Sequence, residues 1–228
     1  MTITTCVFDA YGTLFDVAGA ARQAATELGQ EALAALWPRL AEDWRRKQLE
    51  YTWLRAITGH HVDFRQVTGD GLDWAMEAQA LSDPALRNRL MALYDALPAY
   101  DEVPSMLKTL KTQGFATAIL SNGSPAMLSS AIVSAGIGDV LDAVLSVEEV
   151  GIFKPSARVY GLVGRHFSVP KDEVLFVSSN GWDVCSAAAF GFQTAWVNRA
   201  GAPADRLPAI PGHDLPDLTT IPQIAGAQ

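Results

Sequence analysis

The sequence of 228 residues has little cysteine, few charged residues and no long hydrophobic run. Its two cysteines, Cys6 and Cys185, cannot form the disulfide framework of a small secreted protein. No apolar stretch approaches the roughly 18 residues of a membrane span, and the N-terminus lacks the basic and apolar segments of a signal peptide. Charged residues make up 18% and hydrophobic residues 49%, which excludes disorder as the main state. These absences predict a reduced, cytoplasmic, globular protein with no membrane partner.

The sequence also lacks the positive charge and the motifs of several large binding classes. Lys and Arg number 17 against 25 Asp and Glu, which gives a net charge of −8 and makes the chain a poor partner for nucleic acid. It contains neither a dinucleotide-binding glycine motif nor a Walker-type phosphate loop. The histidines have no metal-like spacing and no context of a catalytic triad; they are His60, His61, His166 and His213.

Short β-favouring runs recur along the chain, and most of them end in a polar loop. They cover residues 2–8, 115–120, 143–146, 174–177 and 193–197. Helical patterns lie between them, over residues 125–135, 155–167 (with Pro155 in the first turn) and 183–190. This alternation predicts an α/β fold, a Rossmann-like parallel sheet with helices on both faces. Ligands of such sheets bind beyond the carboxyl ends of the strands, so the polar ends of these runs are candidates for one site.

Residues 17–98 interrupt the alternation, because they contain helical patterns and no convincing strand. The clearest helix covers residues 40–57, where Arg45 and Leu49 are four residues apart and share one flank. We therefore expect a helical cap domain, residues 17–98, inserted after the first strand over the active edge of the sheet. The core domain comprises residues 1–16 and 99–228, and its end after Gly201 is expected to be an extended surface tail.

Asp9 closes the first strand, where a carboxylate either caps the loop or has a functional role. The string Phe-Asp-Ala-Tyr-Gly-Thr-Leu-Phe-Asp over residues 8–16 resembles the first motif of the haloacid dehalogenase superfamily, in which the leading aspartate is a covalent nucleophile. Phosphatase members carry a second aspartate two positions later, as general acid and base. This sequence has Tyr11 there, so the resemblance favours the dehalogenase branch.

Four further strings are similar to the L-2-haloacid dehalogenases and follow in the same order. They are Trp44 to Tyr51, Leu120 to Ser124, Lys154-Pro155 with Tyr160, and Phe176 to Asp183. The resemblance covers residues 2–198 and implies hydrolysis of (S)-2-haloalkanoic acids to (R)-2-hydroxy acids and halide ion. It further implies inversion at C2, an aspartyl ester on Asp9 that water hydrolyses, no cofactor or metal, and a homodimer.

The resemblance assigns the catalytic roles to a few polar side chains. Lys154 keeps the carboxylate of Asp9 ionised, since a nearby cation counters the effect of burial. Asp183 is expected to activate the hydrolytic water as general base, to cap the helix that follows it, or to do both. Ser178 and Asn180 orient that water or Lys154 by hydrogen bonds.

A second group is expected to bind the substrate and the halide. Arg45 accepts the departing halide from the covering helix, assisted by Asn122 and Tyr11. Ser121 and Thr13, with backbone amides after Asp9, hold the substrate carboxylate. The remaining residues expected around the substrate are Leu49, Phe64 and Trp182, as an apolar wall, and Tyr160.

Three other readings of the sequence remain open. A phosphatase or phosphonatase on the same fold would need Mg²⁺ and a proton donor in place of Tyr11. A hydrolase that opens a strained ring, such as azetidine-2-carboxylate, could use the same attack by Asp9. A catalytically silent binding module should have lost some of the polar residues above, all of which are present.

Overall fold

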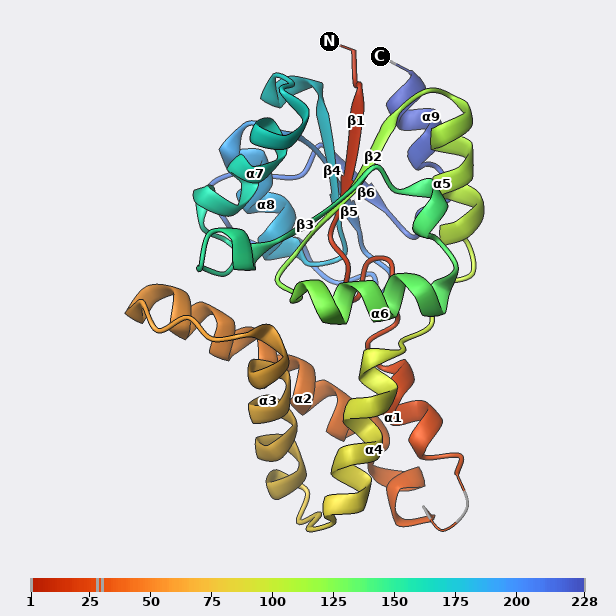
Figure 1. Cartoon of the computed structure of the whole chain (residues 1–228), viewed down its shortest axis with the longest axis vertical. Helices are drawn as coiled ribbons and strands as arrows, with labels where there is room; N and C mark the ends of the chain where they lie inside the picture. The colour runs from red at the N-terminus through yellow and green to blue at the C-terminus, as the bar shows by residue number, and fades with distance from the viewer. Residues whose placement is uncertain (1, 28, 30, 228) are drawn as a thin grey trace.

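A six-stranded parallel sheet forms the centre of the molecule. The structure is a computed structural model that describes residues 2–27, 29 and 31–227 (Figure 1). The strands are β1 (Thr5–Phe8), β2 (Ala116–Ser121), β3 (Ala143–Ser146), β4 (Val174–Ser178), β5 (Gln193–Val197) and β6 (His213–Leu215). Their order is β3-β2-β1-β4-β5-β6, and all five neighbouring pairs are parallel. The predicted α/β fold is thus confirmed.

Helices cover both faces of the sheet, which explains why the central strands are apolar at almost every position. All four residues of β1 and all five of β4 are buried, as in parallel sheets that are packed on both sides. In Figure 1, α7 (Ala157–Phe167) and α8 (Gly181–Phe190) lie on one face, and α5 (Val103–Thr112) and α9 (Ile221–Gly226) on the other. Short 3₁₀ turns occur at Gly138–Val140, Val147–Glu149 and Lys171–Glu173.

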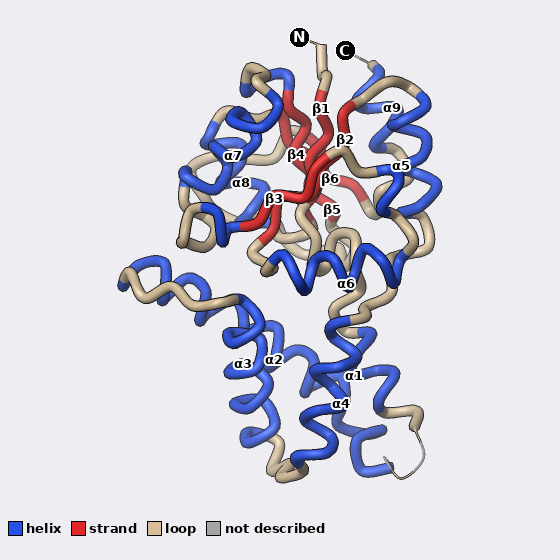
Figure 2. Tube along the Cα trace, in the orientation of Figure 1, coloured by secondary structure: helices blue, strands red, loops and turns tan. Residues whose placement is uncertain are grey.

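The regular structure described between residues 17 and 98 is helical, as the sequence predicts. It consists of α1 (Gly19–Ala24), α2 (Glu31–Thr58), α3 (Phe64–Ala78) and α4 (Pro84–Asp95). Asp63 and Asp83 cap α3 and α4, each accepting from backbone N–H groups of the first turn. These helices lie beyond the end of the sheet at which β1 finishes (Figures 1 and 2), and α6 (Pro125–Ala135) packs against α4. In the part of the chain that is described, none of the helices is long and apolar enough to cross a bilayer.

Several predicted boundaries shift. The strand β1 begins at Thr5 rather than at residue 2, β2 and β4 each end one residue later than expected, and α8 begins at Gly181 rather than at residue 183. The helix α2 begins at Glu31 rather than at residue 40, and Pro38, which normally ends a helical pattern, lies inside it. The helix α7 begins at Ala157, two residues after the expected Pro155, because the Ser156 hydroxyl caps it by accepting from the Arg158 N–H at 3.4 Å.

The expected surface tail after Gly201 is wrong. Residues 213–215 form β6, which pairs with β5 at the edge of the sheet. Beyond it, Leu218, Ile221 and Ala225 are at most 1% exposed, because α9 packs against α5. The end of the chain is therefore part of the core.

The strand order places a topological switch at β1. The chain passes from β1 to β2 and β3 on one side, and then crosses over to β4, β5 and β6 on the other. Since Phe8 is level with Ile119 of β2 and Val177 of β4, the residues that follow these three strands meet at one place. This crevice, facing α2, is where a parallel sheet binds its ligands.

Candidate active site

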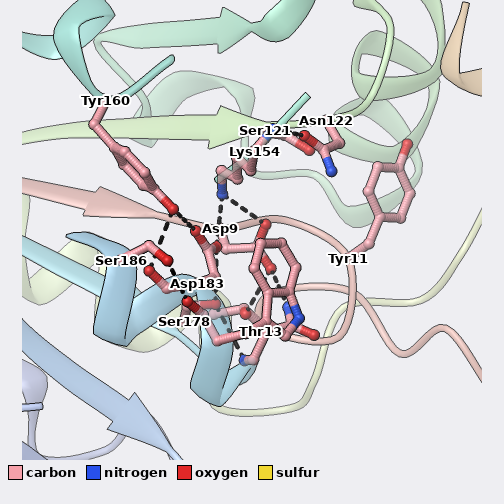
Figure 3. Close-up of polar contacts among 12 residues, drawn as sticks. Asp9, Tyr11, Thr13, Ser121, Asn122, Lys154, Tyr160, Ser178, Asp183 and Ser186 are labelled. Atoms are coloured by element: carbon pink, nitrogen blue, oxygen red, sulfur yellow. Dashed lines mark hydrogen bonds and ion pairs between the residues drawn. The ribbon is translucent and has the colours of Figure 1, made fainter. Parts of the chain in front are cut away.

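Asp9 stands at this switch, directly after β1. Its backbone N–H donates to the Val177 carbonyl at 2.9 Å, and its side chain is 9% exposed. One carboxylate oxygen, Oδ1, accepts from the Lys154 ammonium at 3.1 Å (Figure 3). The other, Oδ2, accepts from the Thr13 hydroxyl and from the Asn180 amide, both at 3.0 Å. These three donors fix the direction in which the carboxylate points.

Lys154 lies between two buried carboxylates. Its ammonium, 1% exposed, donates to Asp9 Oδ1 and, at 2.8 Å, to Asp183 Oδ2. Burial disfavours the charged ammonium, but the carboxylates of Asp183 and Asp9 outweigh it and raise the pKa of Lys154 above its ordinary value of 10.5. The Lys154 backbone N–H donates to Asn122 Oδ1 at 2.9 Å, which ties this loop to the end of β2. The site therefore contains a permanent cation beside Asp9.

Asp183 is the second carboxylate and is fully buried in the first turn of α8. Oδ2 also accepts from the Ser178 hydroxyl at 3.1 Å, and Oδ1 accepts from the Tyr160 hydroxyl at 2.6 Å. Burial raises the pKa of Asp183 above its ordinary value of 3.8, against the opposing effect of Lys154. The alternative of a helix cap fails, because α8 begins at Gly181 and the Asp183 side chain is turned toward Lys154.

Tyr160 and Ser178 lie around Asp183. Burial and the negative charge of Asp183 raise the pKa of Tyr160 well above its ordinary value of 10, so its hydroxyl remains a donor. The Ser178 hydroxyl donates to Asp183 and accepts from the Asn180 N–H at 3.1 Å. Tyr160, expected among the substrate-binding residues, is thus placed behind Asp183 (Figure 3).

Arg45 reaches the site from α2. Its Nη2 donates to the Tyr11 carbonyl at 2.9 Å and to Asn180 Oδ1 at 3.1 Å. Because the Asn180 amide group donates in turn to Asp9, one residue links Arg45 to the carboxylate. Glycine is favoured at residue 12 on two grounds: its φ is +90°, and an added Cβ would lie 3.2 Å from the Ser179 hydroxyl oxygen.

The Thr13 and Ser121 hydroxyls, both expected to hold the substrate carboxylate, have different hydrogen-bond partners. The Thr13 oxygen accepts from the Ser179 N–H at 2.8 Å, and two oxygens lie within reach of its proton: Asp9 Oδ2 at 3.0 Å and the Ser179 hydroxyl at 3.2 Å. The charged carboxylate is the stronger acceptor, so the proton is directed at Asp9. Ser121 is fully buried at the end of β2, and its oxygen accepts from the Gly123 N–H at 3.0 Å. The structure thus brings Thr13, but not Ser121, into contact with Asp9.

Phe64 of the expected apolar wall and Tyr11 of the expected halide site meet in one aromatic group. The ring of Tyr11, 3% exposed, lies 5.5 Å from that of Phe64 and is stacked on Tyr94 at 5.5 Å. Phe64 is 1% exposed at the start of α3 and also lies against Phe153 of the core. These rings therefore form a wall between the helices α3 and α4 and the loop after β1.

The other two residues of the expected apolar wall, Trp182 and Leu49, lie nearer the surface. Trp182, half-buried in the first turn of α8, meets Trp53 of α2 edge-on at 5.4 Å between ring centres. Leu49 is half-buried on α2, on the flank that also carries Arg45. The Trp53–Trp182 contact is a second place, besides Arg45, where α2 approaches the sheet end.

Two residues of the site were not assigned a role from the sequence. Ser179 stands between Ser178 and Asn180, and its backbone N–H holds Thr13. Gln48, in the string Trp44 to Tyr51, accepts from Arg45 Nη1 at 2.8 Å. The spacing of three residues from Arg45 on a predicted helix was the available signal for Gln48.

The space between the two carboxylates does not fit a divalent cation. Mg²⁺ requires oxygen ligands in a near-octahedral arrangement, whereas the Lys154 ammonium already lies within 3.1 Å of both Asp9 and Asp183. Within the described ranges, no three His, Cys, Asp or Glu residues are grouped so that they could hold a metal.

A parallel sheet, a carboxylate buried at its topological switch and a helical segment above it define an α/β protein with a candidate active site at the strand ends. A family of haloacid dehalogenase-like hydrolases matches residues 3–191. The chain is 42% identical over 225 residues to (S)-2-haloacid dehalogenase 1 of Pseudomonas sp. (strain CBS-3), covering 97% of this chain and 96% of that one. It is 41% identical to (S)-2-haloacid dehalogenase 4A of Burkholderia cepacia, covering 96% and 94%.

A solved structure gives the same result. L-2-haloacid dehalogenase from Xanthobacter autotrophicus, with chloropropionic acid covalently bound, superimposes with a TM-score of 0.89 at 33% identity, over 100% of both chains. The chain belongs to the haloacid dehalogenase-like hydrolase family. The two relatives named above, to which it is similar over nearly their full length, are (S)-2-haloacid dehalogenases.

Proposed function

We propose that the chain hydrolyses (S)-2-haloalkanoic acids to (R)-2-hydroxy acids, by way of an ester on Asp9. One observation carries the proposal: Asp9 is buried, held by three donors and paired with Lys154, while Arg45 lies one residue away through Asn180. An ionised carboxylate fixed in this way is a nucleophile, and a guanidinium beside it can receive a leaving anion.

In the first step an oxygen of Asp9 attacks C2 of the substrate from the side opposite the halogen. The new C–O bond forms as the carbon–halogen bond breaks, and the halide leaves with the bonding electrons. Arg45 receives the halide, with Asn122 and Tyr11 beside it. The configuration at C2 inverts, and the carboxylate becomes an ester.

In the second step water attacks the carbonyl carbon of the ester, so C2 is not touched again. Asp183 takes one proton of that water and passes it to the departing alkoxide oxygen, so that the hydroxy acid leaves. The second proton of the water is released to solvent as the carboxylate of Asp9 is restored. The two carboxylate oxygens of Asp183 can accept about four hydrogen bonds. Lys154, Ser178 and Tyr160 donate three of these, which leaves one for the water. A single inversion predicts an (R) product from an (S) substrate.

The substrate is held by polar groups at one end and an apolar wall at the other. Ser121 donates its hydroxyl proton to the substrate carboxylate, together with backbone amides after Asp9. Thr13, whose proton is directed at Asp9, positions the nucleophile instead. The wall around the alkyl group and the halogen is formed by Leu49, Phe64 and Trp182.

We propose the same division of the chain that the sequence suggests. Residues 1–16 and 99–228 form the core domain, and residues 17–98 form the helical cap domain. The enzyme acts in the cytoplasm as a homodimer, with a small haloacid as substrate and halide as product.

The test is chloride release from (S)- and from (R)-2-chloropropionate in the presence of EDTA, with p-nitrophenyl phosphate and Mg²⁺ as the comparison. Turnover of the (S) form alone supports the proposal. Asp9→Asn should then lose at least about a thousandfold in rate, because an amide is a poor nucleophile, whereas Asp101→Asn on the exposed surface should match the wild type. Phosphate release without halide release would identify a phosphatase, and retention of configuration would contradict the single inversion.

A further inference from the structure

The buried amide of Gln48 connects Arg45 to the interior of the helical cap. Gln48 is 1% exposed on α2, one turn after Arg45. Its Oε1 accepts from Arg45 Nη1 at 2.8 Å. Its Nε2 donates to the Thr68 hydroxyl at 2.8 Å and to the Tyr94 hydroxyl at 3.0 Å. One side chain thus joins α2, α3 and α4 behind the guanidinium.

The hydrogen bond that Thr68 donates fixes the orientation of the Gln48 amide. The Thr68 hydroxyl donates to the Phe64 carbonyl at 2.8 Å, and a carbonyl can only accept. The Thr68 proton is therefore committed, so its oxygen must accept from Gln48. As a result Nε2 faces Thr68, and Oε1 is left facing Arg45.

The surrounding helices hold Gln48 in place. Trp44 of α2 donates from its indole N–H to the Thr68 carbonyl at 2.8 Å. At Gly71 of α3 an added Cβ would lie 3.1 Å from the Gln48 backbone nitrogen, so the two helices approach closely at this level. Tyr94, fully enclosed, stacks on Tyr11 of the core. The amide therefore has one available arrangement.

We propose that Gln48 is a positioning residue, which holds the guanidinium of Arg45 in the orientation that receives the halide. An arginine side chain has several rotatable bonds, and fixing it in advance removes the entropy cost from the reaction. With Nη1 held by Gln48, Nη2 is directed at the Tyr11 carbonyl and Asn180. This inference rests on the proposed role of Arg45 in halide release.

The chemistry of the amide matters as well as its position. A carboxylate at residue 48 would also accept from Arg45, but its negative charge would oppose the approach of a halide anion. A carboxylate would also lack the N–H group that donates to the Thr68 hydroxyl oxygen. A neutral acceptor orients the guanidinium and leaves its positive charge available.

The test separates the two chemical steps by rapid mixing, with (S)-2-chloropropionate as the probe. Gln48→Leu keeps the approximate volume and avoids enlarging the small cavity beside Trp44, Arg45 and Gln48. We expect chloride release to slow by about 10- to 100-fold, by analogy with the loss when a residue that orients a metal ligand is removed. Ester hydrolysis should keep its wild-type rate, and Gln48→Glu should slow the same step as Gln48→Leu.

Matched variants test the chain of hydrogen bonds. Thr68→Val should slow chloride release in the same direction, while Thr68→Ser, which keeps the hydroxyl, should restore it. Gln79→Leu is the control, since Gln79 also links two cap helices, through Asp43 at 3.0 Å, but lies outside the network. In an Arg45→Ala background, Gln48→Leu should cost less than about twofold, because the interaction it supports is already gone.

A purely structural role predicts the opposite pattern. Equal loss in both steps, or full additivity with Arg45→Ala, would overturn the proposal. If the wild type releases no halide at all, the proposed function fails, but the orientation of Arg45 is still measurable. Nitrogen-15 NMR should then show separate, slowly exchanging Arg45 Nη signals in the wild type and averaged signals in Gln48→Leu; unchanged signals would refute the positioning role.

Discussion

At the scale of single residues, the site depends on Lys154, a buried cation that interacts with two carboxylates. Lys154 lies within 3.1 Å of both Asp9 and Asp183, and the three side chains are at most 9% exposed. A charge in such surroundings is costly unless it is paired, so removal of Lys154 would leave two carboxylates uncompensated. The difference between the carboxylates then follows from their other partners: Asp9 accepts from Thr13 and Asn180, whereas Asp183 accepts from Ser178 and Tyr160.

The hydroxyl of Tyr160 tunes Asp183, which gives a pH-dependent prediction. Its hydrogen bond favours the ionised carboxylate and lowers the pKa of Asp183, against the larger effect of burial, which raises it. Tyr160→Phe should therefore raise the pKa of Asp183 further. Since a general base acts only when ionised, the loss of ester hydrolysis on the acid side should move to higher pH. Single-turnover formation of hydroxy acid, measured between pH 4 and pH 9, is the readout.

Tyr51→Phe is the matched control for this variant, because Tyr51 is half-buried on α2 and forms no hydrogen bond with Asp183. Its profile should coincide with that of the wild type. The rate of halide release in Tyr160→Phe should change less than that of hydrolysis. An acid limb that stays in place, or moves to lower pH, would show that Asp183 is not the base in the second step.

The sequence motifs identified the residues of the site more readily than the hydrogen bonds that these residues form. Asp9, Lys154 and Asp183 follow from the strand ends and from the resemblance of their strings to one family. The direction of the Thr13 proton could not be predicted, because it depends on Ser179, which is 166 residues away in sequence. Hydrogen-bond partners of this kind are set by the packing of distant loops rather than by local spacing.

At the scale of elements, local patterns predicted the interior better than the edges. The strands β3 and β5 and the helix α6 have the predicted bounds, because β3 ends at Ser146, Asn198 follows β5, and Gly136 in the left-handed conformation follows α6. The strand β6 has only three residues, and the segment before it is rich in proline. Such a segment resembles a loop, and its role as an edge strand comes from pairing with β5.

The C-terminal helix should contribute measurably to stability. Ile221 is 0% exposed where α9 packs against α5, so Ile221→Ala should lower the free energy of unfolding by about 2–5 kcal/mol. Ile210→Ala, at a residue that is 77% exposed, should change it by less than about 0.5 kcal/mol. Urea unfolding followed by circular dichroism measures both. Equal effects would mean that residues after 201 behave as the loose tail that the composition suggests.

At the scale of the whole molecule, the helical cap and the sheet meet at several separate contacts. Besides Arg45 and the Trp53–Trp182 pair, His61 Nε2 lies 3.0 Å from Glu148 Oε2. Asp9 beneath them is 7% exposed. The reacting carboxylate is thus enclosed by residues from both parts of the chain, which excludes bulk water from the nucleophile and strengthens its electrostatic partners.

The outer end of α2 carries the surface that we expect to form the homodimer. Leu54 is 50% and Ile57 81% exposed, one turn apart on the same helix. Beside them is a depression lined by Tyr51, Leu54, Arg55, Asp70 and Asp73. Adjacent apolar side chains above a hollow with charges of both signs suit a self-complementary contact, in which each copy inserts its apolar group into the other.

Analytical ultracentrifugation at micromolar concentration should therefore give a mass twice the 24.5 kDa of the chain. Ile57→Asp should weaken association by at least about tenfold, because a charge would be buried where an apolar side chain was. Val133→Asp, equally exposed at 78% but on α6 of the core, is the control and should leave the dimer intact. Rates per active site should stay the same in both variants, since Asp9 is held by Thr13, Lys154 and Asn180, and neither substituted residue is among them. A monomeric wild type, or a dimer broken by Val133→Asp and not by Ile57→Asp, would remove α2 as the interface.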